Sequence, residues 1–371
     1  MDKTQIIDTA YNYLHNTLGI SECTHLGIAA NIDEWVLKKK PLIDTLRKHP
    51  DWSENDLAIV TEIEEKQGIN KDYFGLCYSL YNAASNANGC MDWNVYCEII
   101  SSCFCNKISC AEAELINTVC PELKIYPNTK SSRVLHKFFQ HIGFDKLSEF
   151  EKIFAQISDC LSTKVVIRKA VLSVNPLDFL TMSNGNSWSN CLTLTPATNY
   201  DGFRYKGKHK AGTLSYMTDE VSCLFYTLDK NSTGPLWSIP KITRQVIFYR
   251  LPLIVHERIY PKSVEYIDEP TNLYVIYKNA VQKLLSECEG IENQWEYNDT
   301  YIKRSSNCFV YPDWKYYTSI RCVNLSVPRS FNSITVGGKS YCIHCGNAKY
   351  KDDDDSCATL LCEDCEEEND E

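Results

Sequence analysis

The stretch Val165-Val-Ile-Arg-Lys-Ala-Val-Leu-Ser-Val174 separates two parts of the chain that have different residue patterns. It is rich in β-branched residues, which favour a strand. Before it, apolar residues recur at helical spacing; after it, short apolar runs alternate with clusters of Gly, Asn and Pro. Helices and strands that segregate along a chain in this way predict an α+β protein.

The residues before this strand, 1–162, are predicted to form a helical domain. The segment 4–14 places its apolar residues on one helical face. Ser53 followed by Asp56 is typical of a helix N-cap with an acid three residues later, and predicts a helix over 57–65. Further helices with an apolar stripe are predicted over 94–104, 110–119 and 146–161.

The residues from 163 to 335 are predicted to form a mixed α+β domain. The segment 271–287 carries its apolar residues at helical spacing and is predicted to be an amphipathic helix. Besides the strand over 165–174, strands are predicted over 188–194, 213–217, 222–228, 245–251 and 255–260.

Two cysteine pairs near the C-terminus predict a metal site. They are Cys342-Ile-His-Cys345 and, after a gap of sixteen residues, Cys362-Glu-Asp-Cys365. Two C-x2-C pairs at this separation can place four sulfurs about 2.3 Å from one Zn²⁺ ion. His344 or Cys357 could substitute as a ligand, but four cysteines are preferred. We therefore expect residues 336–371 to form a small zinc ribbon with an acidic tail, which folds around its metal and can be removed without unfolding the body.

The remaining cysteines are predicted to be reduced thiols that pack as small apolar residues. The chain has 19 cysteines, many of them inside apolar segments. Six lie between Cys90 and Cys120 at irregular spacings without a C-x2-C pair, so core packing is favoured there over a second metal site. The chain shows no secretory signal and no long apolar run, which predicts a cytoplasmic protein without membrane contact.

Acidic residues concentrate at the C-terminus. The formal net charge is −10, and residues 352–371 hold eleven Asp or Glu and no Lys or Arg. The rest of the chain has 37 acidic and 38 basic residues and is therefore nearly neutral. The run Asp352-Asp-Asp-Asp355 is typical of a solvated loop. The alternatives are a surface that attracts a basic partner, or one that repels nucleic acid.

The segment Ser183-Asn-Gly-Asn-Ser-Trp-Ser-Asn-Cys191 is the most unusual internal stretch. It is interpreted either as a turn with Trp188 inserted into the core, or as a functional loop. In the second interpretation Cys191 is a candidate nucleophile and Arg258 would hold an anionic substrate. Asp219 and His256 complete the set of catalytic candidates, with His209 as a second possible base.

Two basic patterns suggest contacts to anions. Between Gly202 and Gly212 four cations alternate with aromatic residues, a pattern that suits phosphate contacts and base stacking and that also occurs in a solvated hairpin. These cations are Arg204, Lys206, Lys208 and Lys210. Downstream, Arg244 and Arg250 are an even number of residues apart on one predicted strand, which predicts either a basic track or buried ion pairs.

Several segments together resemble an uncharacterised protein family of phages and mobile elements of low-GC Gram-positive bacteria. They are Leu46–Trp52, Met182–Cys191, Leu214–Ser222, Arg258–Pro261 and Cys342–Gly346. Where members of that family place a histidine after the cysteine of the Trp-containing loop, this chain has Leu192, which argues against a Cys-His pair at Cys191. The resemblance implies an element-encoded protein in the cytoplasm of a host bacterium and implies no activity.

Three functions remain open on these observations. The leading hypothesis is a phage or mobile-element accessory protein that binds a macromolecule, nucleic acid or a host protein complex, and uses the zinc ribbon as a structural or docking module. The second is an enzyme with its site around the 183–191 loop, Tyr216, Asp219, Arg258 and Tyr260. The third is an inhibitor of a host defence system that inserts its acidic tail into a basic groove. All three leave the oligomeric state open.

Overall fold

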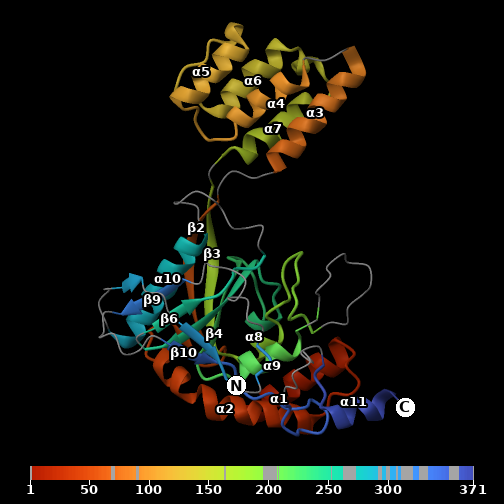
Figure 1. Cartoon of the computed structure of the whole chain (residues 1–371), viewed down its shortest axis with the longest axis vertical. Coiled ribbons are helices and arrows are strands. Elements are labelled where there is room, and N and C mark those ends of the chain that lie inside the picture. The colour runs from red at the N-terminus through yellow and green to blue at the C-terminus, as the bar shows by residue number, and fades with distance from the viewer. Residues whose placement is uncertain are drawn as a thin grey trace. The chain divides into compact units, whose positions relative to one another are not determined.

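The computed structural model of the chain describes residues 2–67, 72–88, 92–162, 164–194, 207, 209–251, 253–261, 273–290, 295–297, 301–305, 308–310, 321–325, 333–350 and 359–370. The chain forms two compact units (Figure 1). The sheet unit comprises Met1–Glu64, Ile167–Glu265 and Asn272–Glu371, and the helical unit comprises Glu65–Val166 with Tyr266–Thr271.

This division differs from the predicted one. The N-terminal 64 residues belong with the sheet rather than with the later helices, and residues 336–371 belong to the same unit. The helical unit is an insertion between two neighbouring strands, β2 (Ala58–Gln67) and β3 (Lys164–Ser173). Dividing the sequence into consecutive domains does not reveal this arrangement, because the contacts that join the early residues to the sheet are distant in sequence. For example, the Trp35 indole donates to the Val174 carbonyl at 2.9 Å.

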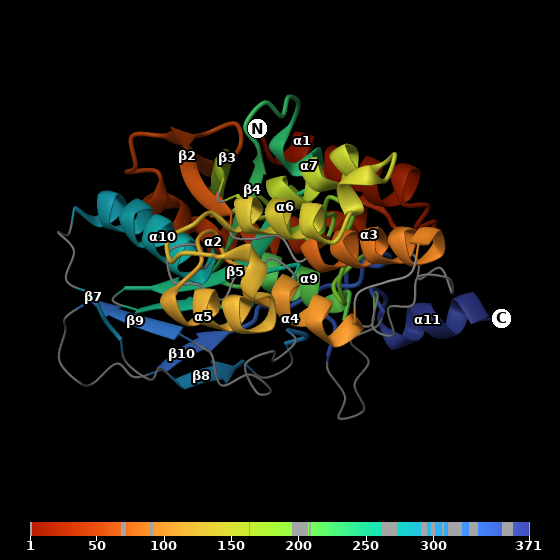
Figure 2. The ribbon, with the colours of Figure 1, turned by 90° about the horizontal axis from the view of Figure 1, so that it is seen from above.

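An eight-stranded sheet forms the centre of the sheet unit. Its strand order is β1-β2-β3-β4-β5-β6-β9-β7. The pairings β1·β2, β3·β4, β4·β5, β5·β6, β6·β9 and β7·β9 are antiparallel. A separate parallel pair joins β8 to β10, and Figure 2 shows these two strands side by side. The strands not yet bounded are β1 (Trp52–Ser53), β4 (Ser222–Asp229), β5 (Thr243–Arg250), β6 (Leu253–His256), β7 (Trp295–Tyr297), β8 (Tyr301–Arg304), β9 (Arg321–Leu325) and β10 (Ser333–Val336).

Helices cover both faces of the central strands. Paired residues of antiparallel strands share a face, so Tyr226 and its partner Arg244 point to one side, and the pair Thr227–Thr243 points to the other. The first side faces α8, because Tyr226 bonds Asp178 of that helix, and the second faces α10, because Thr243 bonds Tyr277. The helices of this unit are α1 (Lys3–Tyr11), followed by a π-helical turn over Asn12–Thr17, α2 (His25–Leu46), α8 (Pro176–Leu180), α9 (Ala211–Met217), α10 (Leu273–Glu289) and α11 (Glu363–Asp370).

The helical unit has its own aromatic core, in which Tyr96, Phe138, Phe139 and Phe150 are buried. Ser109 and Glu112 form a capping box that starts α5. Three thiols of this unit, those of Cys77, Cys103 and Cys120, are buried among its apolar side chains and serve as packing, as predicted, whereas Cys110 is exposed. Its helices are α3 (Asp72–Asn88), α4 (Trp93–Ser102), α5 (Cys110–Val119), α6 (Ser131–His141) and α7 (Phe150–Cys160).

The mixed α+β class is confirmed, and three local predictions are wrong. Residues 58–67 form strand β2, because Ser53 and Asp56 bond each other within the β1–β2 turn and Leu57 has a left-handed φ of 51°. Residues 213–217 are helical and lie in α9; polar Thr213 and Ser215 alternate with apolar residues, which suits a strand, but every residue of this helix is buried. Residues 188–194 form turns rather than a strand. Among the described helices, none is both long and apolar enough to cross a membrane.

Candidate functional site

The four C-terminal cysteines meet at one point. The sulfur atoms of Cys342, Cys345, Cys362 and Cys365 all lie within 4.8 Å of one another, and those of Cys345 and Cys362 are 3.6 Å apart. Tetrahedral coordination at about 2.3 Å requires a sulfur–sulfur separation of about 3.8 Å. The geometry therefore fits one metal ion held by four thiolates, as the cysteine spacing predicts.

Local backbone geometry forms the first half of this site. The turn after Cys342 closes with a bond from the Gly346 amide to the Cys342 carbonyl at 3.0 Å, and Gly346 has a φ of 75° that favours glycine. Burial raises the pKa of the Cys342 thiol, but nearby backbone N–H groups more than offset this and lower it to about 7. His344, considered as a substitute ligand, directs Nδ1 to the Glu22 carbonyl at 2.8 Å. Cys357 lies outside the described residues.

The cysteine turn is docked on the start of helix α2. The Thr24 amide donates to the Ile343 carbonyl at 2.9 Å, and the Thr24 hydroxyl donates to the carbonyl of His344. Asn31 exchanges two bonds with the backbone of Tyr341, at 2.9 and 3.0 Å. A Cβ on Gly27 would lie 2.0 Å from the Ile343 oxygen, so only glycine allows this approach.

The C-terminal segment is thus not the separable ribbon that was expected, because it is attached to the rest of the sheet unit by hydrogen bonds. Residues 336–349 share hydrogen bonds with α2 and also with α9, where the Gly338 amide donates to the Ser215 carbonyl at 2.9 Å. Thr218 donates to the carbonyl of Lys339. The metal site is therefore part of the sheet unit. Residues 336–371 contain few apolar side chains, which suggested a separate ribbon, but the attachment is made by polar and backbone groups.

Asp219, a catalytic candidate, is used by this attachment. Its Oδ1 accepts from the Val221 amide, the Ser222 amide and the Ser222 hydroxyl at 2.7–2.8 Å, and its Oδ2 accepts from the Gly337 amide. Burial raises its pKa, and the buried Lys39 ammonium opposes the rise. These contacts hold the start of β4 against the end of β10 and leave the carboxylate without an open face for a substrate.

Cys191 and His256, two further catalytic candidates, lie on opposite faces of the sheet. His256 pairs with Ile247 across β5 and β6, on the face covered by α10, and its Nδ1 lies 3.2 Å from the Gln245 side chain. The loop with Cys191 lies on the opposite face, near α8. The histidine that reaches Cys191 is His209, whose backbone amide donates to the Cys191 carbonyl at 2.8 Å.

Trp188 fills the space that an active site would need in the 183–191 loop. Its indole nitrogen donates to the carbonyls of Lys241 and Ile242, both at 2.9 Å, and its ring stacks on Tyr260 at 6.3 Å. A Cβ on Gly185 would lie 2.0 Å from the Trp188 ring. This arrangement supports the interpretation of the segment as a turn closed by a tryptophan, with Arg258 half-buried beside Tyr260.

Sequence patterns missed a buried polar network beneath that loop. Asp178 accepts from Ser173 at 2.6 Å and from Tyr226 at 3.0 Å, and pairs with Lys241 at 3.8 Å. Burial lowers the pKa of Lys241 to about 8, and Asp178 opposes the drop. A single lysine after Ile239-Pro240 carries no motif, so only the fold reveals the pair.

The predicted basic contacts are largely outside the described residues. Arg204, Lys206 and Lys208 lie there, and Lys210 is half-buried just before α9. The predicted basic track on β5 is not formed, because Arg244 is 1 % exposed and Arg250 is exposed at the end of the strand.

A groove of about 500 Å³ borders the metal site. It is lined by segments on both sides of the second cysteine pair, including Lys349, Tyr350, Cys362, Glu363, Asp364 and Glu366. Tyr350 is 71 % exposed, and Lys349 is buried with Nζ bonded to the Thr359 carbonyl at 2.6 Å. The lining carries three carboxylates, those of Glu363, Asp364 and Glu366, against the one lysine ammonium, so acidic side chains dominate the groove. Figure 1 shows α11, which carries them, at the C-terminal end of the chain.

A second group of potential ligands lies in the helical unit. The ligand atoms of Cys120, Glu122 and His141 are within 4.8 Å of one another. Cys120 is buried and bonds Glu122 at 3.6 Å, while the carboxylate and the imidazole are exposed. Exposed acids and histidines often lie this close without a metal, so we interpret the group as a thiol–carboxylate contact.

His256 gives the protein a predictable sensitivity to acid. Burial lowers its pKa to about 3, with Lys278 contributing. Between pH 6.5 and 3 the unfolded chain therefore binds a proton that the folded chain does not, and stability present above pH 6.5 is lost on acidification at about 1.4 kcal/mol per pH unit from this residue. Urea unfolding at stepped pH should show a shallower decline in His256→Gln than in wild type. His25→Gln, at an exposed position, should leave the slope unchanged, and an equal slope in all three proteins would contradict the assignment.

Comparison with protein-family models, with curated proteins and with solved structures found no match for this chain.

Proposed function

We propose that the protein is a binding protein in which a structural zinc ion, held by Cys342, Cys345, Cys362 and Cys365, supports an acidic docking groove for a basic protein segment. Zinc is favoured because four thiolates in a tetrahedral set are its usual structural ligands. Four protein ligands leave no position for a catalytic water. The positions of Asp219 and His256 also favour binding over catalysis, because Asp219 is bonded to the Ser222 and Gly337 backbone and His256 lies on the sheet face that α10 covers.

The groove beside the metal site carries this proposal. Glu363, Asp364 and Glu366 line it, and one metal ligand, Cys362, forms part of its wall. The metal therefore fixes the position of the acidic side chains. Tyr350 adds an exposed aromatic surface of the kind enriched at protein interfaces.

The charge of the groove selects between the macromolecular partners. Carboxylates repel nucleic-acid phosphates and attract lysine and arginine side chains. A Lys/Arg-rich protein segment thus fits this surface, and nucleic acid does not. The inhibitor hypothesis would use the same surface against a basic groove, and the origin in a phage or mobile element stays a prediction from the sequence.

Charge-neutralising variants of α11 should test the partner. In the full chain, Glu363→Gln/Asp364→Asn/Glu366→Gln should weaken binding of a fluorescent Lys/Arg-rich peptide by about tenfold or more at low salt, as measured by anisotropy. The matched control is Glu367→Gln/Glu368→Gln, which removes two charges of the same helix at positions that are not among the groove-lining residues, and its effect is compared per charge removed.

Equal weakening in both variants would reduce the effect to net charge and contradict a groove. Tight binding of single- or double-stranded DNA that survives the groove variant, with none to the peptide, would overturn the proposal in favour of a nucleic-acid partner elsewhere. Metal content measured in each variant confirms that the cysteine site is retained.

A further inference from the structure

Arg244 is a buried cation for which the structure describes no anionic partner. Its side chain is 1 % exposed, and its Nε donates to the Met182 carbonyl at 3.1 Å. Its Nη2 is buried and makes no hydrogen bond. Its neighbour Lys241 differs, because that equally buried ammonium is paired with Asp178. An unpaired guanidinium in a protein interior is costly, since burial removes its hydration and nothing described replaces it at Nη2.

A second buried donor without a partner lies in the same loop assembly. Asn190 is 6 % exposed, and its Oδ1 accepts from the Ser183 hydroxyl at 2.7 Å and from the Leu192 amide at 2.9 Å. Its Nδ2 makes no hydrogen bond. Ser183 follows Met182, the residue that accepts from Arg244, so a short chain of contacts connects the two unused donors.

Tyr260 lies beside the first of these donors. The Arg244 guanidinium lies 4.9 Å from the centre of its ring, and that of Arg258 lies 5.6 Å from it. Cation–π contact stabilises a guanidinium in part, but it satisfies no N–H group. Arg244 and Arg258 thus lie beside the same ring, and Trp188 of the 183–191 loop also stacks on it.

The chemistry of the unused groups defines what they can bind. Both are pure donors, so a ligand must present acceptor atoms to both. A guanidinium matches oxyanions best, because its planar N–H groups bond carboxylate and phosphate oxygens with charge assistance. A neutral ligand would leave the cation uncompensated.

We propose that Arg244, Arg258 and Asn190 form a binding site for a small oxyanion, the phosphate or carboxylate group of a ligand, beneath the 183–191 loop. This site is independent of the C-terminal groove. Because both unused donors are shielded from solvent, the ligand reaches them only when the loop that carries Trp188 moves. Bound oxyanion would neutralise the buried guanidinium and hold the loop closed.

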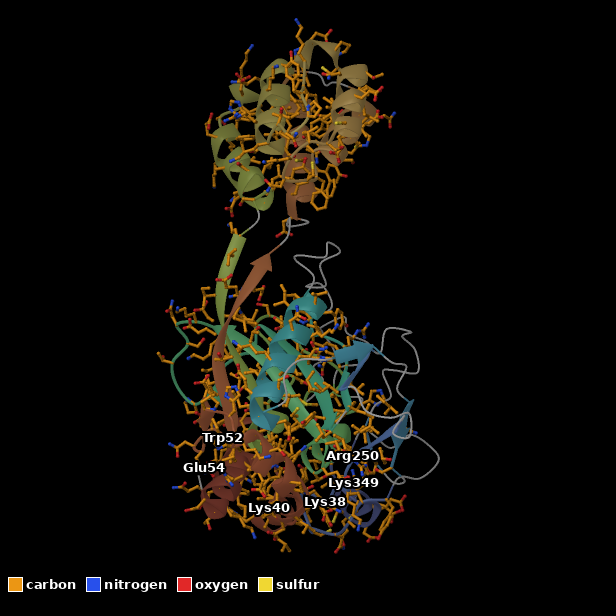
Figure 3. All side chains as sticks on the ribbon, turned by 90° about the vertical axis from the view of Figure 1, so that its left-hand side faces the viewer. Lys38, Lys40, Trp52, Glu54, Arg250 and Lys349 are labelled. Atoms are coloured by element: carbon orange, nitrogen blue, oxygen red, sulfur yellow. The ribbon has the colours of Figure 1, made fainter. Side chains whose placement is uncertain are left out.

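Thermal unfolding of the full chain in increasing inorganic phosphate should test this site, with chloride at matched ionic strength as the reference. Phosphate should raise the melting temperature of wild type in a saturable way, from which an apparent Kd follows. Arg244→Gln should weaken that Kd by about 10- to 100-fold, the range expected for loss of a charge-assisted bond. Arg250→Gln is the matched control, since it removes the same charge from an exposed position of the same strand β5; Figure 3 labels this residue.

Two further variants keep the test decisive if Arg244→Gln does not fold. Asn190→Asp retains the Oδ1 acceptor and replaces the Nδ2 donor with a carboxylate oxygen, which repels an anionic ligand. Arg258→Gln removes a positive charge at a half-buried position. Both variants should weaken phosphate binding. Stabilisation by acetate rather than phosphate would identify a carboxylate source and still support an oxyanion site. No stabilisation by either anion, or equal stabilisation in all variants, would overturn the proposal.

Discussion

Replacing Cys342 and Cys345 with Ser is expected to destabilise the whole sheet unit, by about 3 kcal/mol or more, and to abolish binding of about one zinc ion per chain. Structural zinc sites couple metal binding to folding, and four thiolates brought together without metal repel one another once ionised. Here the loss should extend beyond the metal site, because the Cys342–Cys345 turn is bonded to Thr24 and Asn31 at the start of α2.

Tryptophan fluorescence can locate this effect. Six of the seven tryptophans belong to the sheet unit, and Trp93 alone belongs to the helical unit. Urea unfolding followed by tryptophan emission therefore reports mainly on the sheet unit. Cys110→Ser, at an exposed thiol of the helical unit, is the control and should retain both zinc and stability. An unchanged tryptophan transition in the zinc-free double variant would show that the C-terminal segment folds separately.

The cysteine spacing was sufficient to predict the metal site because its geometry is local. A C-x2-C turn brings two sulfurs together whatever the rest of the chain does, and only the meeting of the two pairs depends on the fold. Helices with a clear apolar stripe, such as α5 and α10, could be predicted from the sequence in the same way. The α+β class followed from the segregation of these patterns along the chain.

The contacts that the sequence did not reveal are long-range and polar. In the sequence, Asn31 is an ordinary polar residue of an amphipathic helix. Only the fold shows that it bonds the backbone of Tyr341. Arg244 has the spacing of a surface track with Arg250, yet the register of β5 turns it inward beneath the 183–191 loop. Residue type and spacing show that a strand carries a charge. They do not show which face of the strand is covered.

The helical insertion was hidden for a related reason. Residues 1–64 and the inserted helices are both rich in apolar stripes, so composition does not change at the boundary between them. The separating element, β2, contains Glu62 and Glu64 and follows a plausible helix cap, so its sequence also suits a helix. Pairing with β3, about a hundred residues later, determines its conformation.

Replacing Lys39 with Met is expected to lower the free energy of unfolding by about 3–5 kcal/mol, the usual result of breaking a buried charge pair from one side. Lys39 is fully buried, donates to the carbonyls of Tyr216 and Ser222, and lies 4.8 Å from the centre of the Phe179 ring. Burial lowers its pKa to about 8, and the Asp219 carboxylate is the largest opposing influence. The substitution leaves Asp219 as a buried carboxylate without its compensating cation.

The flanking residues of the same helix provide the control. Lys38 and Lys40, labelled in Figure 3, are exposed, so Lys38→Met should change stability by less than about 0.5 kcal/mol in urea unfolding. Asp219→Asn should lower the free energy of unfolding by a similar amount to Lys39→Met. The double variant should lower it by less than the sum of the two single losses, because it removes both charges and leaves neither uncompensated. Additive losses would show that the two residues act independently. A Lys39→Met protein as stable as Lys38→Met would show that Asp219 is not held ionised by this lysine, and the carboxylate would then return to the list of candidates for binding or catalysis.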